Sequence, residues 1–235
     1  MSGHLEIRGL QVRFGRATIL QGIDLSVLGA PLSVVGRNGM GKTTMCSALM
    51  GMVSASGSAK LDGKEILGLG TGRVARSGIA LVPQGRRMFP SLSVHEHLVL
   101  VAQKGNPAWT IDRVYETFPR LAERRRNGGD QLSGGEQQML AISRALLMNP
   151  KLVIMDEPSE GLAPVIVDHL IEVLRNIATE GMGLLLIEQN LRVATSVSEQ
   201  VAIMVTGKIA ATLNSAELAA DRDLQNRYLG VSHGH

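Results

Sequence analysis

The chain has 235 residues, enough for one large domain or two small ones around a sizeable hydrophobic core. A formal net charge of +3 gives no general case for nucleic-acid binding, and aromatic residues at 3% leave little for base stacking. No apolar run approaches the roughly 20 residues that span a bilayer, and residues 1–6 lack a secretory-signal pattern. We therefore expect a soluble cytosolic α/β enzyme that meets any membrane through a partner.

Three local features predict ordinary structure. Cys46 is the only cysteine, so an internal disulfide is impossible, and we expect a small core residue. The basic cluster formed by Arg120 and the arginines at 124–126 predicts a solvated helix face. The tail at 232–235 carries two histidines, where we expect an unstructured end in preference to a metal site.

Short β-like runs and glycine turns fill the first third of the chain. Apolar patterning predicts the first helix directly after a glycine-rich loop. In chain order, the expected elements are β-runs over 5–35 with turns at Gly9, Gly15, Gly22 and 29–31, including a buried strand at 32–35, then a helix at 44–50, strand-and-turn structure over 54–72 with a hairpin at 60–64, and a buried strand at 79–82.

Helices and apolar strands alternate in the rest of the chain, which is typical of α/β proteins. We see no internal repeat and no low-complexity linker. The expected elements are helices at 93–103 and 111–126, a break at 128–129, a helix at 135–148, strands at 151–155 and 184–187 with a helix at 164–180 between them, a hairpin of strands 201–205 and 208–213, and a C-terminal helix ending near 228.

The run Gly36-Arg37-Asn38-Gly39-Met40-Gly41-Lys42-Thr43 fits the phosphate-loop pattern G-x-x-x-x-G-K-[ST]. Its glycines let successive N–H groups point at phosphate oxygens, and the following helix N-terminus adds partial positive charge. Lys42 can reach the β- and γ-phosphates, and the Thr43 hydroxyl can ligate Mg²⁺. The alternative is a glycine-rich turn before an ordinary helix, which the strand–loop–helix context disfavours. The motif predicts binding of a nucleoside triphosphate.

A second motif is the apolar run from Leu152, which ends in Asp156 and Glu157. A buried strand that delivers acids at its carboxyl end places them in the crevice where α/β sheets bind ligands. Asp156 can hold Mg²⁺, and Glu157 can accept a proton from the water that attacks the γ-phosphate. Alone, this run could equally be a strand that enters an acidic turn. The phosphate loop favours the catalytic interpretation.

A third motif, Leu132-Ser133-Gly134-Gly135-Glu136-Gln137, opens the helix before the acidic strand. Ser133 is a good N-cap and Glu136 stands three residues later, so an ordinary capping box is one interpretation. The functional interpretation is a second anion site, made by the serine hydroxyl and the glycine N–H groups at a helix start.

With these motifs in this order, the chain resembles the ATP-binding subunit of an ABC transporter over essentially its whole length. The resemblance implies an α/β P-loop NTPase (RecA-like) ABC ATPase core, an antiparallel β subdomain and an inserted α-helical subdomain. A single nucleotide-binding domain would span 1–235. The core and β subdomain would occupy about 1–84 and 150–235, and the helical subdomain with the signature motif would occupy about 85–149.

The resemblance also assigns roles to individual residues. Residues 132–137 match the family signature, and Gln84 matches the glutamine that links nucleotide to the transmembrane partner. Phe14 stands where the family places an aromatic ring against adenine, although such a residue read alone is more often part of the core. The implied ATP-binding residues are Phe14, Gly36, Arg37, Asn38, Gly39, Met40, Gly41, Lys42, Thr43 and Thr44. The implied Mg²⁺ residues are Thr43, Gln84 and Asp156.

The implied mechanism needs two such subunits that face each other head to tail. Each ATP lies between the phosphate loop of one subunit and Leu132, Ser133, Gly134, Gly135, Glu136 and Gln137 of the other. The implied catalytic residues are Glu157, Gln84 and Gln189. The chain offers no obvious arginine finger, and the signature supplies that stabilisation in the family. Loss of the γ-phosphate would open the dimer, and the transmembrane subunits would follow.

Two positions depart from the common family pattern. Gln189 follows the strand at 184–187 where the family usually has a histidine; glutamine can donate a hydrogen bond to phosphate but cannot carry a proton or charge. The alternative is that Gln189 only caps the next helix. Ala163 stands where an aspartate is common, which weakens any argument for polar coupling across the dimer there.

These departures, with Gly85-Arg86-Arg87-Met88-Phe89-Pro90, resemble one ATPase of the branched-chain amino-acid importers and their urea and short-amide relatives. The resemblance implies transmembrane permease subunits, a second and non-identical ATPase subunit, and an external solute-binding protein. The chain would then lie peripherally on the cytoplasmic face of the inner or plasma membrane. Residues from Gln84 to about His97 would contact the permease, with a plain surface loop as the alternative.

Two other functions remain open from the residues alone. One is a non-transport ABC ATPase acting on ribosomes or DNA, a class that usually carries two nucleotide domains, a coiled coil or a zinc hook. The other is a nucleotide-gated regulatory module that scarcely hydrolyses ATP. Glu157 argues against the second possibility, while Gln189 leaves it open.

Overall fold

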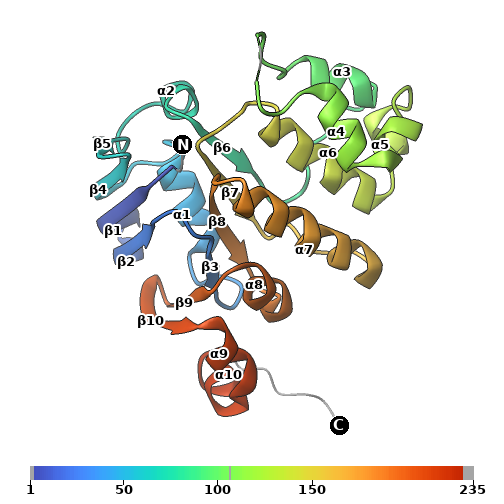
Figure 1. Cartoon of the computed structure of the whole chain (residues 1–235). Coiled ribbons are helices and arrows are strands. Elements are labelled where there is room, and N and C mark those ends of the chain that lie inside the picture. The colour runs from blue at the N-terminus through green and yellow to red at the C-terminus, as the bar shows by residue number, and fades with distance from the viewer. Residues whose placement is uncertain (1–2, 106, 230–235) are drawn as a thin grey trace.

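Two β-sheets organise the protein in the computed structural model, which describes residues 3–105 and 107–229 (Figure 1). The tail at 232–235 lies outside these ranges. The first sheet is antiparallel in the order β2-β1-β4-β5. Its strands are β1 (Leu5–Phe14), β2 (Ala17–Val27), β4 (Ser56–Leu61) and β5 (Lys64–Glu65).

The second sheet has the order β10-β9-β3-β8-β7-β6, and all its neighbours are parallel except the edge strand β10. Apolar runs buried on both faces form its central strands, as parallel sheets require. Its strands are β3 (Leu32–Val35), β6 (Ile79–Val82), β7 (Leu152–Asp156), β8 (Gly183–Glu188), β9 (Gln200–Val205) and β10 (Lys208–Asn214).

The two larger hydrophobic cores of the described residues lie on opposite faces of this parallel sheet. Ile154 of β7 packs into the core shared with α1 (Lys42–Leu49) and the antiparallel sheet. Its neighbours Val153 and Met155 pack into the other core, against α6 (Gly134–Leu146) and α7 (Pro164–Thr179). Side chains alternate across a strand, so a continuous apolar run serves both cores at once. The α/β class predicted from the sequence is confirmed.

The remaining helices are short. Helices α3 to α6 gather on one side of the parallel sheet, at some distance from the antiparallel sheet (Figure 1). None of the helices in the described ranges is long and apolar enough to cross a membrane. The short helices are α2 (Thr71–Arg76), α3 (Val94–Val99), α4 (Ile111–Thr117), α5 (Pro119–Glu123), α8 (Leu191–Val197), α9 (Ser215–Ala220) and α10 (Arg222–Leu229), with a 3₁₀ turn at Gly129–Gln131.

The prediction of turns at Gly9 and Gly22 is wrong. Strand β1 continues through Gly9 and β2 through Gly22, with left-handed φ angles of +56° and +86°. The register of the two strands shifts at these places, so each glycine permits an irregularity in the ladder. The predicted hairpin at 60–64 is confirmed by the antiparallel pairing of β4 and β5.

Helix lengths differ most from the prediction between 93 and 126. The single helix expected over 111–126 is broken at Phe118, because Pro119 lacks an N–H and disfavours the helical conformation at the residue before it, where φ is −125° and ψ is 74°. Helix α3 ends at Val99, well short of 103. The expected C-terminal helix is likewise two helices, separated by the extended Asp221.

Other expectations hold. Cys46 is buried, as expected of a small core residue. The arginines at 124–126 are exposed, and Arg120 pairs with Glu123 one turn along the same helix. The cluster is therefore a solvated face. Helix α2 was not predicted, because the glycines at 70 and 72 around its start favour a turn over a helix.

Candidate functional site

The phosphate loop joins β3 to α1. At two of its positions, Gly36 and Gly41, neighbouring residues pack so closely that only glycine fits. A Cβ on Gly36 would lie 2.5 Å from the carbonyl oxygen of Met204. Gly41 has a left-handed φ of +103°, and a Cβ there would lie 2.9 Å from Leu20 Cδ2. A side chain at either position would displace the loop or its neighbours, so glycine fixes the path of the backbone.

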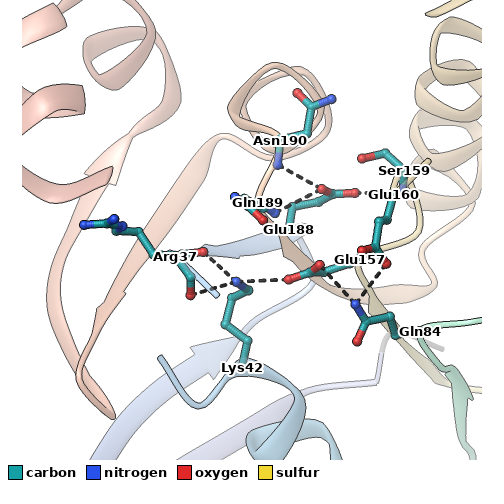
Figure 2. A network of polar contacts seen from close by, with 10 residues as sticks. Arg37, Lys42, Gln84, Glu157, Ser159, Glu160, Glu188, Gln189 and Asn190 are labelled. Atoms are coloured by element: carbon teal, nitrogen blue, oxygen red, sulfur yellow. Dashed lines mark hydrogen bonds and ion pairs between the residues drawn. The ribbon is translucent and has the colours of Figure 1, made fainter. Parts of the chain in front are cut away.

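Lys42 turns back into the loop and reaches the carboxylate at the end of β7. Its Nζ donates to the carbonyl oxygens of Gly36 at 2.5 Å and Arg37 at 3.1 Å. The same nitrogen lies 3.0 Å from Oε1 of Glu157, and both side chains are almost fully buried (Figure 2). A buried ion pair of this kind needs both partners, because either charge alone would be left without compensation.

A cleft of about 450 Å³ lies above the loop. It brings together residues from five parts of the fold: the end of β1, the start of β2, the phosphate loop with the start of α1, the loop after β6 and the residue that follows β7. The predicted site residues that line it are Phe14, Asn38, Gly39, Gly41, Lys42, Thr43, Thr44, Gln84 and Glu157.

Phe14 is the largest apolar side chain of this cleft and is 52% exposed. The alternative that it is a core residue is therefore wrong. An exposed aromatic ring beside a phosphate loop is suited to stacking on a flat base.

Asp156 ends β7 within the buried part of the site and is 2% exposed. Burial raises the pKa of its carboxyl; a hydrogen bond from Thr43 opposes this shift, and the charge of Glu157 adds to it. Oδ1 of Asp156 has no hydrogen-bond partner among the described residues. A buried carboxylate oxygen without a partner, next to a threonine hydroxyl, fits the oxygen ligands that Mg²⁺ prefers.

An Asp156→Asn variant tests how much the buried negative charge of Asp156 destabilises the nucleotide-free protein. Because the pKa is raised, the ionised carboxylate is less favourable in the folded protein than in the unfolded chain. The neutral isostere should raise the Tm of the nucleotide-free protein at pH 7 in EDTA, and it should lose Mg²⁺-dependent ATP hydrolysis. The difference in Tm should shrink as the pH falls toward the raised pKa, because the unmodified carboxyl then protonates. A lower Tm for the variant at pH 7 would contradict this account.

Glu157 follows in a left-handed conformation, with φ at +49°. Its N–H donates to the carbonyl oxygen of Ile187 at 2.8 Å, which extends the contact with β8 by one residue. Non-glycine residues adopt this conformation at a cost of about 1–3 kcal/mol, and such strain concentrates at functional sites.

Gln84 contacts two carboxylates in this structure. Its Nε2 donates to Glu160 Oε2 at 2.9 Å and lies 3.5 Å from Glu157 Oε2 (Figure 2). Nearby, Arg86 donates to the carbonyl oxygen of Glu160 at 3.2 Å. The sequence singled out Gln84 but missed Glu160 and the contact of Arg86, because the residues after Pro158 come close to 84–86 only in the folded chain.

The signature segment starts α6 and forms the capping box. Ser133 Oγ accepts the N–H of Glu136 at 3.3 Å, and Glu136 Oε2 accepts the N–H of Ser133 at 2.8 Å. Gly135 lets α6 approach α7, since a Cβ there would lie 3.1 Å from Ile166. A Cβ on Gly134 would meet the guanidinium of Arg86 at 2.6 Å. The capping interpretation is confirmed, and the anion-binding interpretation stays a prediction.

Leu132 and Gln137, the remaining signature residues, are also held at the start of α6. Leu132 is buried, and the side chain of Gln137 donates to the carbonyl oxygen of Gly129 at 3.0 Å. Within the described ranges, residues 132–137 do not line the cleft that holds the phosphate loop. One subunit therefore has the two predicted halves of the site in different places, as a head-to-tail pair requires.

Gln189 is exposed at the end of β8. The alternative that it caps the following helix is wrong, because Asn190 is the N-cap of α8 and its side chain accepts the N–H of Val193. The residue before it, Glu188, is buried and accepts three backbone N–H groups. Sequence reasoning missed Glu188, although an acid at the end of an apolar strand was the signal that identified Asp156.

Fold and loop together define a P-loop ATPase of the cassette type. Residues 20–160 match the ABC transporter family, and the chain belongs to that family. It is 37% identical to the high-affinity branched-chain amino acid transport ATP-binding protein BraG of Pseudomonas aeruginosa, over 92% of this chain and 95% of that protein. It is also 32% identical to the lipopolysaccharide export system ATP-binding protein LptB of Haemophilus influenzae, over 85% of each chain.

The solved structure of an ATP-binding cassette of an ABC transporter in its ADP conformation has the same fold. The TM-score is 0.80 at 24% identity, and the alignment covers 98% of this chain and all of that one. The protein is accordingly an ATP-hydrolysing subunit that works with transmembrane permease components.

Proposed function

We propose that this subunit energises an importer of branched-chain amino acids or related amino acids and amides, from the cytoplasmic face of the membrane. The cleft that joins Phe14, the phosphate loop, Gln84 and Glu157 is the observation that carries the ATPase chemistry. The higher identity to BraG than to LptB supports import over lipopolysaccharide export, as does the sequence Glu188-Gln189-Asn190.

In the proposed reaction, Phe14 stacks on the adenine and the N–H groups of the phosphate loop hold the phosphates. Lys42 leaves Glu157 for the β- and γ-phosphates, which frees the Glu157 carboxylate to accept a proton from the attacking water. Mg²⁺, when bound by Thr43, Gln84 and Asp156, supplies charge neutralisation at the phosphate oxygens. Gln189 donates a hydrogen bond to the γ-phosphate.

The second half of each site comes from a non-identical ATPase subunit. Ser133 and the N–H groups of Gly134 and Gly135 of this chain serve the ATP of that partner, and its signature serves the ATP held here. The separation of the two halves within one chain supports this arrangement. An external solute-binding protein delivers the solute to the permease.

A second cleft, of about 380 Å³, suits the permease. It lies beside α1 and α6 and shares Thr43 and Gln84 with the first cleft, and Asp156 also lines it. Away from the nucleotide site its lining includes Met50, Met148, Arg87 and Arg144. Met52 also lines this cleft and Phe89 lies in the loop 84–97; each side chain is 50% exposed. We assign this cleft and the loop 84–97 to permease docking. An apolar surface with an arginine rim fits an amphipathic helix that carries acidic groups.

Buried His97 stabilises the docking loop. Its Nε2 accepts the N–H of Phe89 at 2.9 Å, and its Nδ1 lies 2.8 Å from the carbonyl oxygen of Ser93. The Phe89 ring also stacks on His97, with ring centroids 5.8 Å apart. The half-exposed Phe89 ring is therefore held in place by the buried His97.

The direct test is purification of the tagged full-length chain from detergent-solubilised membranes of its own cell, with the partners identified by mass spectrometry. Two polytopic membrane proteins and a second ATPase support the importer, and the associated binding protein can then be screened for amino acids. Recovery of lipopolysaccharide-export components, ribosomal proteins or DNA-associated proteins would overturn the proposal.

A Phe89→Asp variant should lose permease co-purification by at least about tenfold, because a charge would replace an apolar anchor at the docking surface. Leu28→Asp is the matched control, since Leu28 is 61% exposed and lies between β2 and β3, outside the docking loop. The ratio of permease to ATPase in the purified material measures the effect. Equal recovery with both variants would show that Phe89 is outside the contact.

A further inference from the structure

Glu188 stands out among the buried charges because it binds backbone groups from two different loops. It is the last residue of β8 and is 1% exposed. Its Oε1 accepts the N–H of Ser159 at 3.0 Å, and its Oε2 accepts the N–H groups of Gln189 and Asn190, both at 3.1 Å (Figure 2). One carboxylate thus joins the loop after β7 to the loop after β8.

The two loops belong to the reaction site. Strands β7 and β8 are parallel neighbours, so their carboxyl ends lie at the same edge of the sheet. The loop after β7 begins with Glu157 and continues to Glu160, which accepts the amide of Gln84. The loop after β8 begins with the exposed Gln189. Any shift of one loop relative to the other would stretch the hydrogen bonds to Glu188.

The chemistry of these contacts calls for a carboxylate. All three partners are N–H donors, and only an ionised carboxylate offers acceptors on both oxygens. A glutamine of the same shape would direct its NH₂ group against at least one of these N–H donors. Burial raises the pKa of the Glu188 carboxyl, and hydrogen bonds from Ser159 and Asn190 oppose that shift. The hydrogen bonds thus offset part of the cost of a buried charge.

We propose that Glu188 is a positioning residue for ATP hydrolysis, which holds Gln189 against the γ-phosphate in a fixed relation to the loop that starts at Glu157. This inference rests on the proposed contact between Gln189 and the γ-phosphate. Glu188 itself does not touch the nucleotide. It sets the backbone from which Gln189 projects, and it makes that backbone follow any movement of the loop at 159–160.

A double-mutant cycle on the full-length chain tests the proposal. Glu188→Gln should lower kcat about tenfold and change the KM for ATP by less than about twofold, because binding contacts stay and orientation is lost. Gln189→Ala should lower kcat by a similar factor. In the Gln189→Ala background, Glu188→Gln should change kcat by less than about twofold, because the group that it positions is gone. Glu199→Gln, an exposed glutamate near β9, is the control.

Amide hydrogen exchange gives a readout that does not depend on activity. In Glu188→Gln, the amides of Ser159, Gln189 and Asn190 should exchange faster together, while those within β7 and β8 keep their protection. If Glu188→Gln fails to fold, Glu188→Asp replaces it. That variant keeps the charge but withdraws the carboxylate by one methylene, and an intermediate loss of kcat is expected.

The outcomes separate the two proposals. A normal kcat for Gln189→Ala would overturn the γ-phosphate contact, and the inference about Glu188 with it. A defect in Gln189→Ala beside a normal kcat in Glu188→Gln would overturn the inference about Glu188 alone. An equal tenfold loss from Glu188→Gln in both backgrounds would also overturn it, because Glu188 would then act independently of Gln189.

Discussion

A Glu157→Gln variant should bind ATP and lose about 10²–10⁴-fold in turnover, which is the usual contribution of a general base. The amide keeps the shape of the side chain and can still accept a hydrogen bond from Lys42, so the nucleotide-free site should stay intact. It cannot take a proton from water. ATP should therefore remain bound and unhydrolysed, and the proposed pair of ATPase subunits should stay closed around it. Steady-state phosphate release and size-exclusion chromatography with ATP measure the two effects.

Glu160→Gln is the matched control for this experiment. Glu160 accepts the same Gln84 amide at 2.9 Å and carries the same charge, but it lies four residues beyond the end of β7. Its loss should reduce turnover less than tenfold, because it can affect the reaction only through Gln84. If Glu157→Gln hydrolyses ATP at the unmodified rate, Glu157 is not the base.

Features predicted correctly from the sequence are those encoded in consecutive residues. The phosphate loop, the acidic end of β7 and the capping box at Ser133 each occupy a single short segment. Local geometry then fixes what these residues do: glycine permits the loop path at Gly36 and Gly41, and an apolar strand delivers Asp156 to the sheet edge. Such features need no knowledge of distant contacts.

Features that were missed depend on contacts between distant segments. The acceptor for Gln84 lies 76 residues away, and Glu188 binds an N–H that lies 29 residues before it. Neither partner is visible until parallel strands bring their carboxyl ends together. The break at Phe118 is different, because Pro119 is visible in the sequence and indicates a helix boundary. The apolar periodicity on both sides of the proline nevertheless favoured one long helix over two.

The pairing of Lys42 with Glu157 also became visible only in the folded chain, and it changes what each residue does before ATP arrives. The sequence assigns Lys42 to phosphates and Glu157 to water. In this structure they neutralise each other within the buried site, at 3.0 Å. ATP then competes with Glu157 for Lys42, so binding of the triphosphate and release of the base become one event. Because the ion pair forms without ATP, its contribution to the stability of the nucleotide-free protein can be measured.

Lys42→Met should abolish detectable ATP hydrolysis, and it should also destabilise the nucleotide-free protein by about 3–5 kcal/mol, the usual cost of leaving one partner of a buried ion pair alone. Methionine replaces most of the lysine side chain with an unbranched apolar chain that is one atom shorter, so packing changes little. The Glu157 carboxylate would remain beside Asp156 without its cation, and the like charges of these two carboxylates repel each other. Urea unfolding in EDTA, without nucleotide, measures the loss.

The double variant Lys42→Met with Glu157→Gln separates the ion pair from the shape of the site. Removing both charges leaves no unpaired group, so the double variant should be more stable than Lys42→Met by at least about 1 kcal/mol, although neither hydrolyses ATP. Glu157→Gln alone should cost less than Lys42→Met, because Lys42 keeps the carbonyl oxygens of Gly36 and Arg37. Additive losses would mean that the pair contributes nothing to the nucleotide-free state. A favourable coupling energy between the two residues would establish that Lys42 holds Glu157 in an ion pair until a phosphate of ATP replaces the carboxylate.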